Sequence, residues 1–394
     1  MIKISAIEEG RQDFFKDQHF NMVIQGNNQF GFNLLKKLNG RQGNLYFSSY
    51  SIASGLARLY IAARNETANE MQRVLKYTPA FSPLIGTLDN FFLTALPLKN
   101  STRLFLASGV WLQEGVPVIP AYQFGLERDF NSKAETIDFK KGFINSIRTI
   151  NQAVAKQTEN QISQILTTQD ITDQTQLIIT TAFAVKGGWL YPFDRKDTQK
   201  TAFHLNEKQT RQVEMMYGTL ECPCFRSENL NLIEIPLKPP EGSQIRLSLF
   251  ILLPKEKMGW KTISSELSIE NWDKWESGLK SQLVYLGLPR FRLEDRLNLN
   301  IILQSLGMKQ AFDQNADFTG MSEAKGLKLS NVAHKTLLKI DEKGIESTRI
   351  NQTGPAQNLD NTEAIKFLID HPFYIFLVDR ASGSILSIGR VLQP

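Results

Sequence analysis

The chain has 394 residues, of which 42% are hydrophobic and 22% are charged. Its 25 glycines and 15 prolines make up about a tenth of the sequence, which excludes collagen-like, low-complexity and mostly disordered proteins. The formal net charge of +5 is spread along the chain without a block of like charges, so we expect no nucleic-acid partner.

No apolar run approaches the length of about 18 residues that suggests a membrane-spanning helix, so we expect no membrane partner either. Residues 1–10 lack the apolar segment of a signal peptide. We therefore expect a cytoplasmic protein, or an extracellular, secreted protein whose leader has been removed. Cys222 and Cys224 flank Pro223 and are too close together to connect distant elements, which excludes a disulfide framework.

Hydrophobic spacing predicts helices mainly in the first half of the chain and strands in the second. Residues 1–28 are polar and aperiodic and predict an N-terminal arm, which leaves 29–394 as the folded domain. In chain order, the patterns predict helices at 32–38, 51–64 and 67–75, a strand at 103–112, a helix at 147–154, strands at 177–185, 232–236, 247–253 and 283–293, a helix at 299–306, and strands at 327–341, 365–369, 373–379 and 384–391. This order, without regular βαβ alternation, is typical of one large α+β domain with mostly antiparallel sheets.

Two segments stand out from this pattern. The strand at 177–185 is apolar apart from Thr180 and Thr181 and carries no charge, which indicates that both of its faces are covered. Residues 342–364 show little periodicity and are rich in Asn, Gln, Thr and Gly. A loop of this length inside a compact domain is usually functional or disordered. It joins two predicted strands, so we expect its ends to be anchored.

The sequence contains no recognisable catalytic motif. A nucleophile elbow, a P-loop, a dinucleotide fingerprint and a zinc-protease motif are all missing, and the four histidines lack metal-ligand spacing, so we expect no enzyme, no metal and no cofactor. Strand alternation places His334 on one face with Val332, Thr336, Leu338 and Ile340. We therefore expect His334 to be buried, neutral and satisfied by hydrogen bonds.

The segments on both sides of the long loop resemble the C-terminal signature of the serpin family. They are Lys339-Ile-Asp-Glu-Lys-Gly344 before the loop, and Asp370-His-Pro-Phe373 and Gly389-Arg390 after it. Further matches, in chain order, lie at Asn44–Ser48 with Ser51-Ile52, at Asn151, at Thr158-Glu159, at Lys186–Trp189 with Pro192-Phe193, at Leu288–Phe291, at Leu306-Gly307 and at Ala316-Asp317. The resemblance covers about residues 28–394.

The resemblance implies a serpin fold with about eight or nine helices, three β-sheets and an exposed reactive-centre loop at 342–364. In inhibitory serpins a protease cleaves this loop and becomes covalently attached, and the loop then inserts into the main sheet as a new strand. The implied partner is a target protease, most simply a serine protease, and we expect a monomer. Such an inhibitor needs no catalytic residues of its own.

The resemblance also assigns a hinge at the start of the loop, and Gly344 marks it. The hinge residues are Glu342, Lys343, Gly344, Ile345, Glu346, Ser347 and Arg349. Insertion would turn every second side chain into the core, namely Ile345, Ser347, Arg349, Asn351 and Thr353. Burying an unpaired guanidinium costs at least several kcal/mol. Two functions therefore remain open, an inhibitor and a non-inhibitory serpin, or protease substrate, whose loop inserts poorly because of Arg349.

Two counts place the cleavage site. Counting from Gly344 gives Asn358–Leu359, and counting back from Phe373 gives about Asn361. Lys and Arg are missing between residues 350 and 363, which disfavours a trypsin-like target. Elastase-like or chymotrypsin-like serine proteases and an asparagine-preferring cysteine protease remain as candidate targets.

The resemblance further indicates a polar cluster beneath the main sheet, near the place where the sheet opens. Its shutter and breach residues are Ser48, Ser51, Thr181, Trp189 and His334. Thr181 stands where the family usually has Asn. We predict a hydrogen bond between His334 and Ser48 or Thr181.

Overall fold

The structure, a computed structural model, describes residues 17–77, 81–94, 102–240, 243, 245–345 and 364–394. The helices of these residues are α2 (Gln18–Leu38), α3 (Ser49–Tyr60), α4 (Asn65–Leu75), α5 (Phe81–Thr94), α6 (Pro120–Phe130), α7 (Phe143–Gln157), α8 (Trp260–Glu266), α9 (Ile269–Ser277) and α10 (Asn300–Leu306), with 3₁₀ turns η2 (Arg195–Asp197) and η3 (Gln310–Phe312). The strands are β1 (Leu45–Phe47), β2 (Arg103–Gln113), β3 (Ala134–Ile137), β4 (Leu177–Gly188), β5 (Gln199–His204), β6 (Thr210–Arg226), β7 (Leu230–Pro236), β8 (Leu247–Pro254), β9 (Lys280–Pro289), β10 (Phe291–Asn298), β11 (Asn331–Asp341), β12 (Gly344–Ile345), β13 (Ile365–Leu368), β14 (Phe373–Asp379) and β15 (Ser384–Val391).

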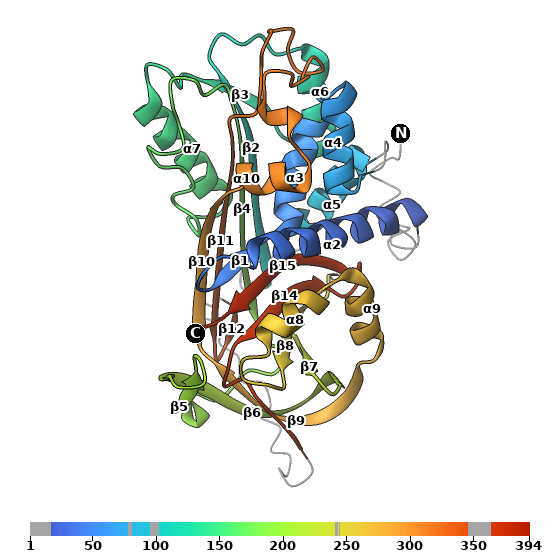
Figure 1. The fold of residues 1–394 in the computed structure, drawn as a ribbon, viewed down its shortest axis with the longest axis vertical. Coiled ribbons are helices and arrows are strands. Elements are labelled where there is room, and N and C mark those ends of the chain that lie inside the picture. Colours follow the sequence, from blue (N-terminus) through green and yellow to red (C-terminus); the bar gives the residue numbers. More distant parts are fainter. Residues whose placement is uncertain (1–16, 78–80, 95–101, 241–242, 244, 346–363) are drawn as a thin grey trace.

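A six-stranded sheet forms the long axis of the molecule, with strand order β10-β11-β12-β4-β2-β3. Helix α7 lies against one face of this sheet, and α3 with its neighbouring helices lies on the other (Figure 1). β11 and β4 run parallel and pair directly over most of their common length. The sheet is therefore a central layer with helices on both faces.

The apolar residues of β4 pack on both faces of the six-stranded sheet. Ile178 and Ala182 belong to the hydrophobic cluster under α7, together with Ile150 of that helix. Ile179 and Phe183 belong to the main core on the opposite face. Both faces of the strand are buried, as the sequence predicts.

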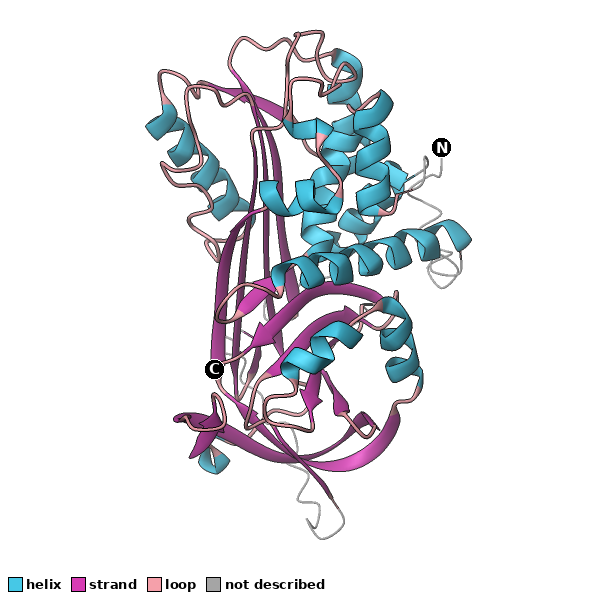
Figure 2. Cartoon of the chain, in the orientation of Figure 1, coloured by secondary structure: helices cyan, strands magenta, loops and turns pink. Residues whose placement is uncertain are grey.

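The second sheet has nine strands in the order β1-β15-β14-β8-β7-β6-β9-β13, with β5 also paired to β6. The long strand β6 pairs with β7 near one end and with β9 and β5 over the rest, so it joins two groups of strands into one hydrogen-bonded network. Figure 2 shows this sheet curving beneath the helical half of the molecule. Together the two sheets and the nine α-helices of the described residues make the predicted α+β architecture. The expected number of three sheets is wrong for these residues, because β6 pairs with strands of both groups and joins them into one sheet.

The N-terminal boundary differs from the sequence prediction. Helix α2 begins at Gln18, after Asp17 accepts a hydrogen bond from the backbone N–H of His19 at 2.7 Å, so the expected arm at 1–28 is wrong for residues 18–28. Val23 is fully buried in this helix, and so is the side chain of Asn27. The buried polar residues hid the helical period from the sequence pattern. Residues 1–16 lie outside the described part of the chain.

A second difference concerns the predicted strand at 283–293. The chain turns at Arg290, so that β9 ends at Pro289 in the nine-stranded sheet and β10 begins at Phe291 in the six-stranded sheet. One apolar run thus contributes strands to two sheets, which alternation alone does not reveal.

Across the described ranges, we find no helix that combines the length and the apolar character needed to cross a bilayer.

Candidate functional site

The start of the long loop already lies within the six-stranded sheet. β12 is held between β11 and β4, with Ile345 opposite Ile340 on one side and Gly187 on the other. The side chain of Ile345 is fully buried. Beyond β12, β11 and β4 pair directly with each other, up to Leu337 opposite Ala184. The sheet is therefore open at one end, where it holds the hinge, and closed along the rest.

Gly344 fits this position because it has no side chain. Its φ of +148° is a backbone conformation that other residues rarely adopt. A Cβ atom at Gly344 would lie 2.0 Å from the carbonyl oxygen of Gly187 and 2.7 Å from the Cα of Gly188. The close approach of β12 to β4 therefore requires glycine at this point.

Trp189 holds the turn that leads into β12. Its backbone N–H donates to the carbonyl oxygen of Lys343 at 3.0 Å, and its indole Nε1–H donates to the carbonyl oxygen of Asp341 at 2.9 Å. The Trp189 side chain is fully buried, and the N–H of Phe193 donates to the carbonyl oxygen of Glu342 at 3.0 Å. The breach residue predicted from the resemblance thus contacts the hinge directly.

Glu342 adds a charged contact to this turn. Its buried carboxylate accepts a hydrogen bond from Thr198 Oγ1 at 2.9 Å and lies 3.6 Å from Nε of Arg290. Arg290 also pairs with Glu214, so one guanidinium serves two carboxylates. Sequence reasoning named Glu342 but missed Thr198 and Arg290, because these partners come from elements far apart in the chain.

The predicted polar cluster is assembled around His334, beneath the closed part of the sheet. The backbone N–H of Ser48 donates to His334 Nε2 at 3.0 Å, and His334 Nδ1 lies 2.8 Å from Thr181 Oγ1. Because Nε2 accepts, the proton of the neutral ring sits on Nδ1 and points to Thr181. Burial lowers the pKa of His334 to about 3, so the ring is neutral near pH 7. Both predicted partners of His334 are confirmed.

Ser48 and Ser51 connect this cluster to the surrounding elements. Ser48 Oγ donates to the carbonyl oxygen of Leu386 at 2.6 Å and accepts from the N–H of Ser51 at 3.0 Å, which caps helix α3. Ser51 Oγ donates to the carbonyl oxygen of Ala182 at 3.4 Å. The cluster therefore joins β11, β4, α3 and β15 at the point that a strand would have to pass if it entered the sheet from β12.

The remaining hinge and cleavage predictions lie outside the described residues. They are Glu346, Ser347 and Arg349 of the hinge, the inward positions Asn351 and Thr353, and the scissile-bond candidates Asn358, Leu359 and Asn361. Within the described ranges, no three His, Cys, Asp or Glu side chains gather in a way that could hold a metal ion. β12 lies beside the point where the direct pairing of β11 with β4 begins. A strand that continued from β12 between these two strands would pair with both of them, so this position is a site for strand addition.

Residues 25–394 match the family model of serpins, described as serine protease inhibitors. The chain is 32% identical to an uncharacterized serpin-like protein of Thermococcus kodakarensis, covering 99% of this chain and 90% of the relative. It is 29% identical to the leukocyte elastase inhibitor of Xenopus tropicalis, covering 93% and 97% of the two chains.

Solved structures show the same fold. Uncleaved ovalbumin superposes with a TM-score of 0.85 at 24% identity, covering 94% of this chain and all of the other (100%). Human thyroxine-binding globulin, complexed with its hormone, superposes with a TM-score of 0.85 at 23% identity, covering 95% and 99%. The family match spans nearly the whole chain, including every element that builds the hinge and the polar cluster. The chain therefore belongs to the serpin family.

Proposed function

We propose that this serpin inhibits a serine-type endopeptidase through residues 342–364, which act as its reactive-centre loop. The serine oxygen of the protease attacks the carbonyl carbon at the cleavage site, near Asn358–Leu359 or Asn361. The C–N bond breaks, the new amine departs with the C-terminal part of the chain, and an ester joins the loop to the protease. The N-terminal part of the loop then continues β12 into the sheet and carries the protease with it. A cysteine protease that prefers asparagine would form a thioester in the same way.

The position of β12 is the observation that supports this proposal. Its residues already pair with β11 and β4, so the first step of strand addition is present before any cleavage. Each further residue of the loop that entered would find backbone partners on both neighbours. Because the mechanism uses no disulfide bond, it can operate in an extracellular protein as well as in a cytoplasmic one.

A second function, that of a non-inhibitory serpin or a mere protease substrate, is favoured by one specific feature. In the register of β12, the inward positions after Ile345 are Ser347 and Arg349. The feature is Arg349, because burying its guanidinium without a partner would slow insertion. A slowly inserting loop lets the acyl-enzyme hydrolyse before the protease is trapped. The fold also serves other roles, since one solved neighbour is a globulin that binds thyroxine.

The test is incubation with a panel of proteases, namely elastase-like and chymotrypsin-like serine proteases and an asparagine-specific cysteine protease. We expect a complex that survives SDS electrophoresis with at least one of them, and mass spectrometry should locate the cut at residues 358–361. The matched control is the same protease with its nucleophile already blocked, which should form no complex. Cleavage at Arg349 alone, or complete cleavage without any complex, would contradict the inhibitory function.

A further inference from the structure

Residues 158–176, here called the linker, join α7 to β4 and lie over the closed pairing of β11 with β4. We call this pairing the seam, and it runs from Asn331 opposite Ile178 to Leu337 opposite Ala184. One hydrophobic cluster contains residues of the linker and of both strands, among them Ile165 and Ile171 of the linker, Ile178 and Ala182 of β4, and Ala333 and Leu337 of β11. The linker and both strands of the seam therefore share one core.

An ion pair, here called the tie, fixes the linker to the β10 side of the seam. Nη1 of Arg296 on β10 lies 2.9 and 3.1 Å from the two carboxylate oxygens of Asp170 in the linker, and Nη2 donates to Thr167 Oγ1 at 3.3 Å. The amide Nδ2 of Asn331, the first residue of β11, donates to the carbonyl oxygen of Asp170 at 3.1 Å. The linker is thus attached to β10 and β11, although it continues directly into β4.

The carboxylate of Asp170 is held in place for this contact. Its side chain is only 5% exposed, and that of Arg296 is 28% exposed. The backbone N–H and the hydroxyl of Thr167 donate to Asp170 Oδ2 at 2.7 and 2.9 Å. Without the guanidinium, the buried charge of Asp170 would be incompletely compensated. The tie therefore differs from an exposed surface pair, which contributes little to stability.

The chain between the tie and β4 is short and bent. Only residues 171–176 separate Asp170 from Leu177, where β4 begins. Within them, the N–H of Thr175 donates to the carbonyl oxygen of Thr172 at 3.1 Å, and the N–H of Thr172 donates to Thr175 Oγ1 at 2.9 Å. A strand inserted into the seam would move β11 and β4 apart by about one strand spacing, roughly 4.8 Å. Complete opening must therefore break the tie or pull the linker away from its hydrophobic cluster.

We propose that the tie between Asp170 and Arg296 holds the seam shut at the end far from β12, and so limits how fast an inserting strand completes its entry. The effect on insertion rests on the function proposed above, whereas the effect on the seam concerns the intact protein alone. A strand that enters from β12 separates Leu337 from Ala184 first and Asn331 from Ile178 last. Asp170 and Arg296 are therefore positioning residues, which act through the linker on the last part of insertion.

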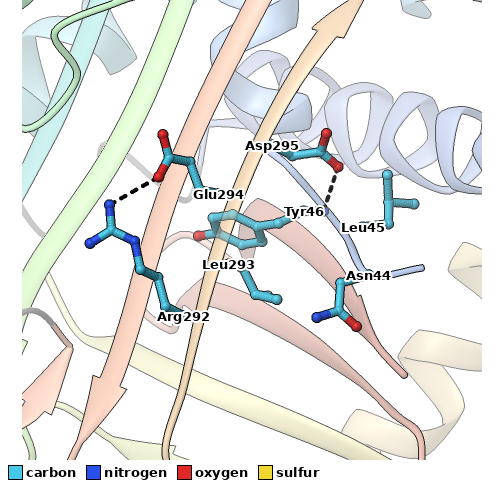
Figure 3. Close-up of a pocket in the computed structure, with 7 residues that line it drawn as sticks. All are labelled: Asn44, Leu45, Tyr46, Arg292, Leu293, Glu294 and Asp295. Carbon is cyan, nitrogen blue, oxygen red and sulfur yellow. Dashed lines mark hydrogen bonds and ion pairs between the residues drawn. The ribbon is translucent and has the colours of Figure 1, made fainter. Parts of the chain in front are cut away.

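A neighbouring group of charges on β10 supplies a matched control. Glu294 contacts Arg292 of its own strand at 2.9 Å and Lys335 of β11 at 2.7 Å, and Figure 3 shows its carboxylate turned toward Arg292. Glu294 and Arg296 are two residues apart, so they lie on the same face of the strand. Because β10 and β11 are on the same side of the seam, neither of these contacts of Glu294 crosses it.

The test measures hydrogen exchange in the intact protein for wild type, Asp170→Asn, Arg296→Gln and the double variant. We expect the N–H groups that bond across the seam to exchange at least about tenfold faster in each variant, because removing one partner of a largely buried pair is strongly destabilising. The double variant should resemble the single variants, since the two residues form one contact. Arg296→Lys keeps the charge without the planar fork and should fall between Arg296→Gln and wild type. Glu294→Gln should match wild type, and the β7–β8 pairing in the other sheet should exchange equally in all proteins.

The same proteins are then incubated with the protease panel, and the amount trapped in an SDS-stable complex is compared with the amount merely cleaved. Asp170→Asn and Arg296→Gln should raise the trapped fraction, and Glu294→Gln should leave it unchanged. Wild-type exchange across the seam in both tie variants overturns the tie, whatever happens with the protease. Faster exchange in both sheets alike would show general destabilisation and would also overturn it.

The remaining outcomes separate the tie from the proposed function. Faster exchange confined to the seam, with no complex in any protein, supports the tie and contradicts the inhibitory function. Faster exchange confined to the seam, with complexes whose fraction does not change, confirms that the tie closes the seam and refutes its control of insertion.

Discussion

Replacing Gly344 by alanine should release the hinge from the sheet without unfolding the protein. The added methyl group would lie 2.0 Å from the carbonyl oxygen of Gly187, on the adjacent strand. The backbone at this residue, with φ of +148°, also disfavours any residue that has a side chain. Both effects act on β12 and leave the closed part of the sheet untouched.

The magnitudes decide the outcome. Holding β12 in place gains mainly the burial of Ile345, which stabilises by about 1.5–3 kcal/mol, and a few backbone hydrogen bonds of about 0.5–1.5 kcal/mol each. Against this, a residue other than glycine in such a conformation costs about 1–3 kcal/mol, and the overlap with β4 adds a further 1–3 kcal/mol or so. The penalty is comparable to the whole gain, so a substantial fraction of the molecules should have β12 released from the sheet.

Hydrogen exchange measures this directly, because the N–H of Trp189 donates to the carbonyl oxygen of Lys343 and loses its partner when the hinge leaves. We expect faster exchange at Trp189 and at Ile345 in the Gly344→Ala variant, with unchanged exchange in the closed ladder between β11 and β4. Gly326→Ala is the control: Gly326 also has a positive φ, of +73°, but an added Cβ would meet no atom within 4 Å. If Gly344→Ala retained wild-type protection at Trp189, the steric reasoning would be refuted.

Two further predictions concern stability. The pKa of His334 is about 3 in the folded protein and about 6.5 in an unfolded chain, so the unfolded chain binds the proton first as pH falls. The free energy of unfolding should therefore decrease below pH ~6.5, by up to about 1.4 kcal/mol per pH unit. Urea unfolding between pH 4.5 and 7.5 should show that the unfolding free energy of His334→Gln depends less steeply on pH than that of the wild type. An equal pH dependence in the two proteins would contradict a buried, neutral His334 ring. Asp89 is buried with Arg58 at 3.0 Å and accepts from Tyr50 and Ser54, so Asp89→Ala should lower the unfolding free energy by about 3–5 kcal/mol. Glu66→Gln, in an exposed pair, is its control, and equal effects of the two substitutions would argue against a special role for the buried network.

The local patterns of the chain were sufficient for much of the framework. The largely apolar, uncharged run at the start of β4 predicts coverage on both faces, and the alternation around His334 predicts a buried ring. Both are properties of single strands, which a short window of sequence contains completely. The helix at Gln18–Leu38 was cut short in the prediction because buried Asn27 and Asn28 interrupt its apolar period, and Asn28 is satisfied by contacts with Gly383 and Ile385 far along the chain.

By itself, then, the sequence determined the fold class, the serpin resemblance and the residue types at the hinge, because each depends on short-range spacing or on ordered motifs. The tertiary structure alone decided that Ile345 lies between β11 and β4, and that Thr198 and Arg290 lie against the carboxylate of Glu342. These facts depend on the pairing and register of strands that are distant in the chain. Such pairing is set by the packing of the whole core, because a shift of one residue would turn every side chain of a strand to the opposite face.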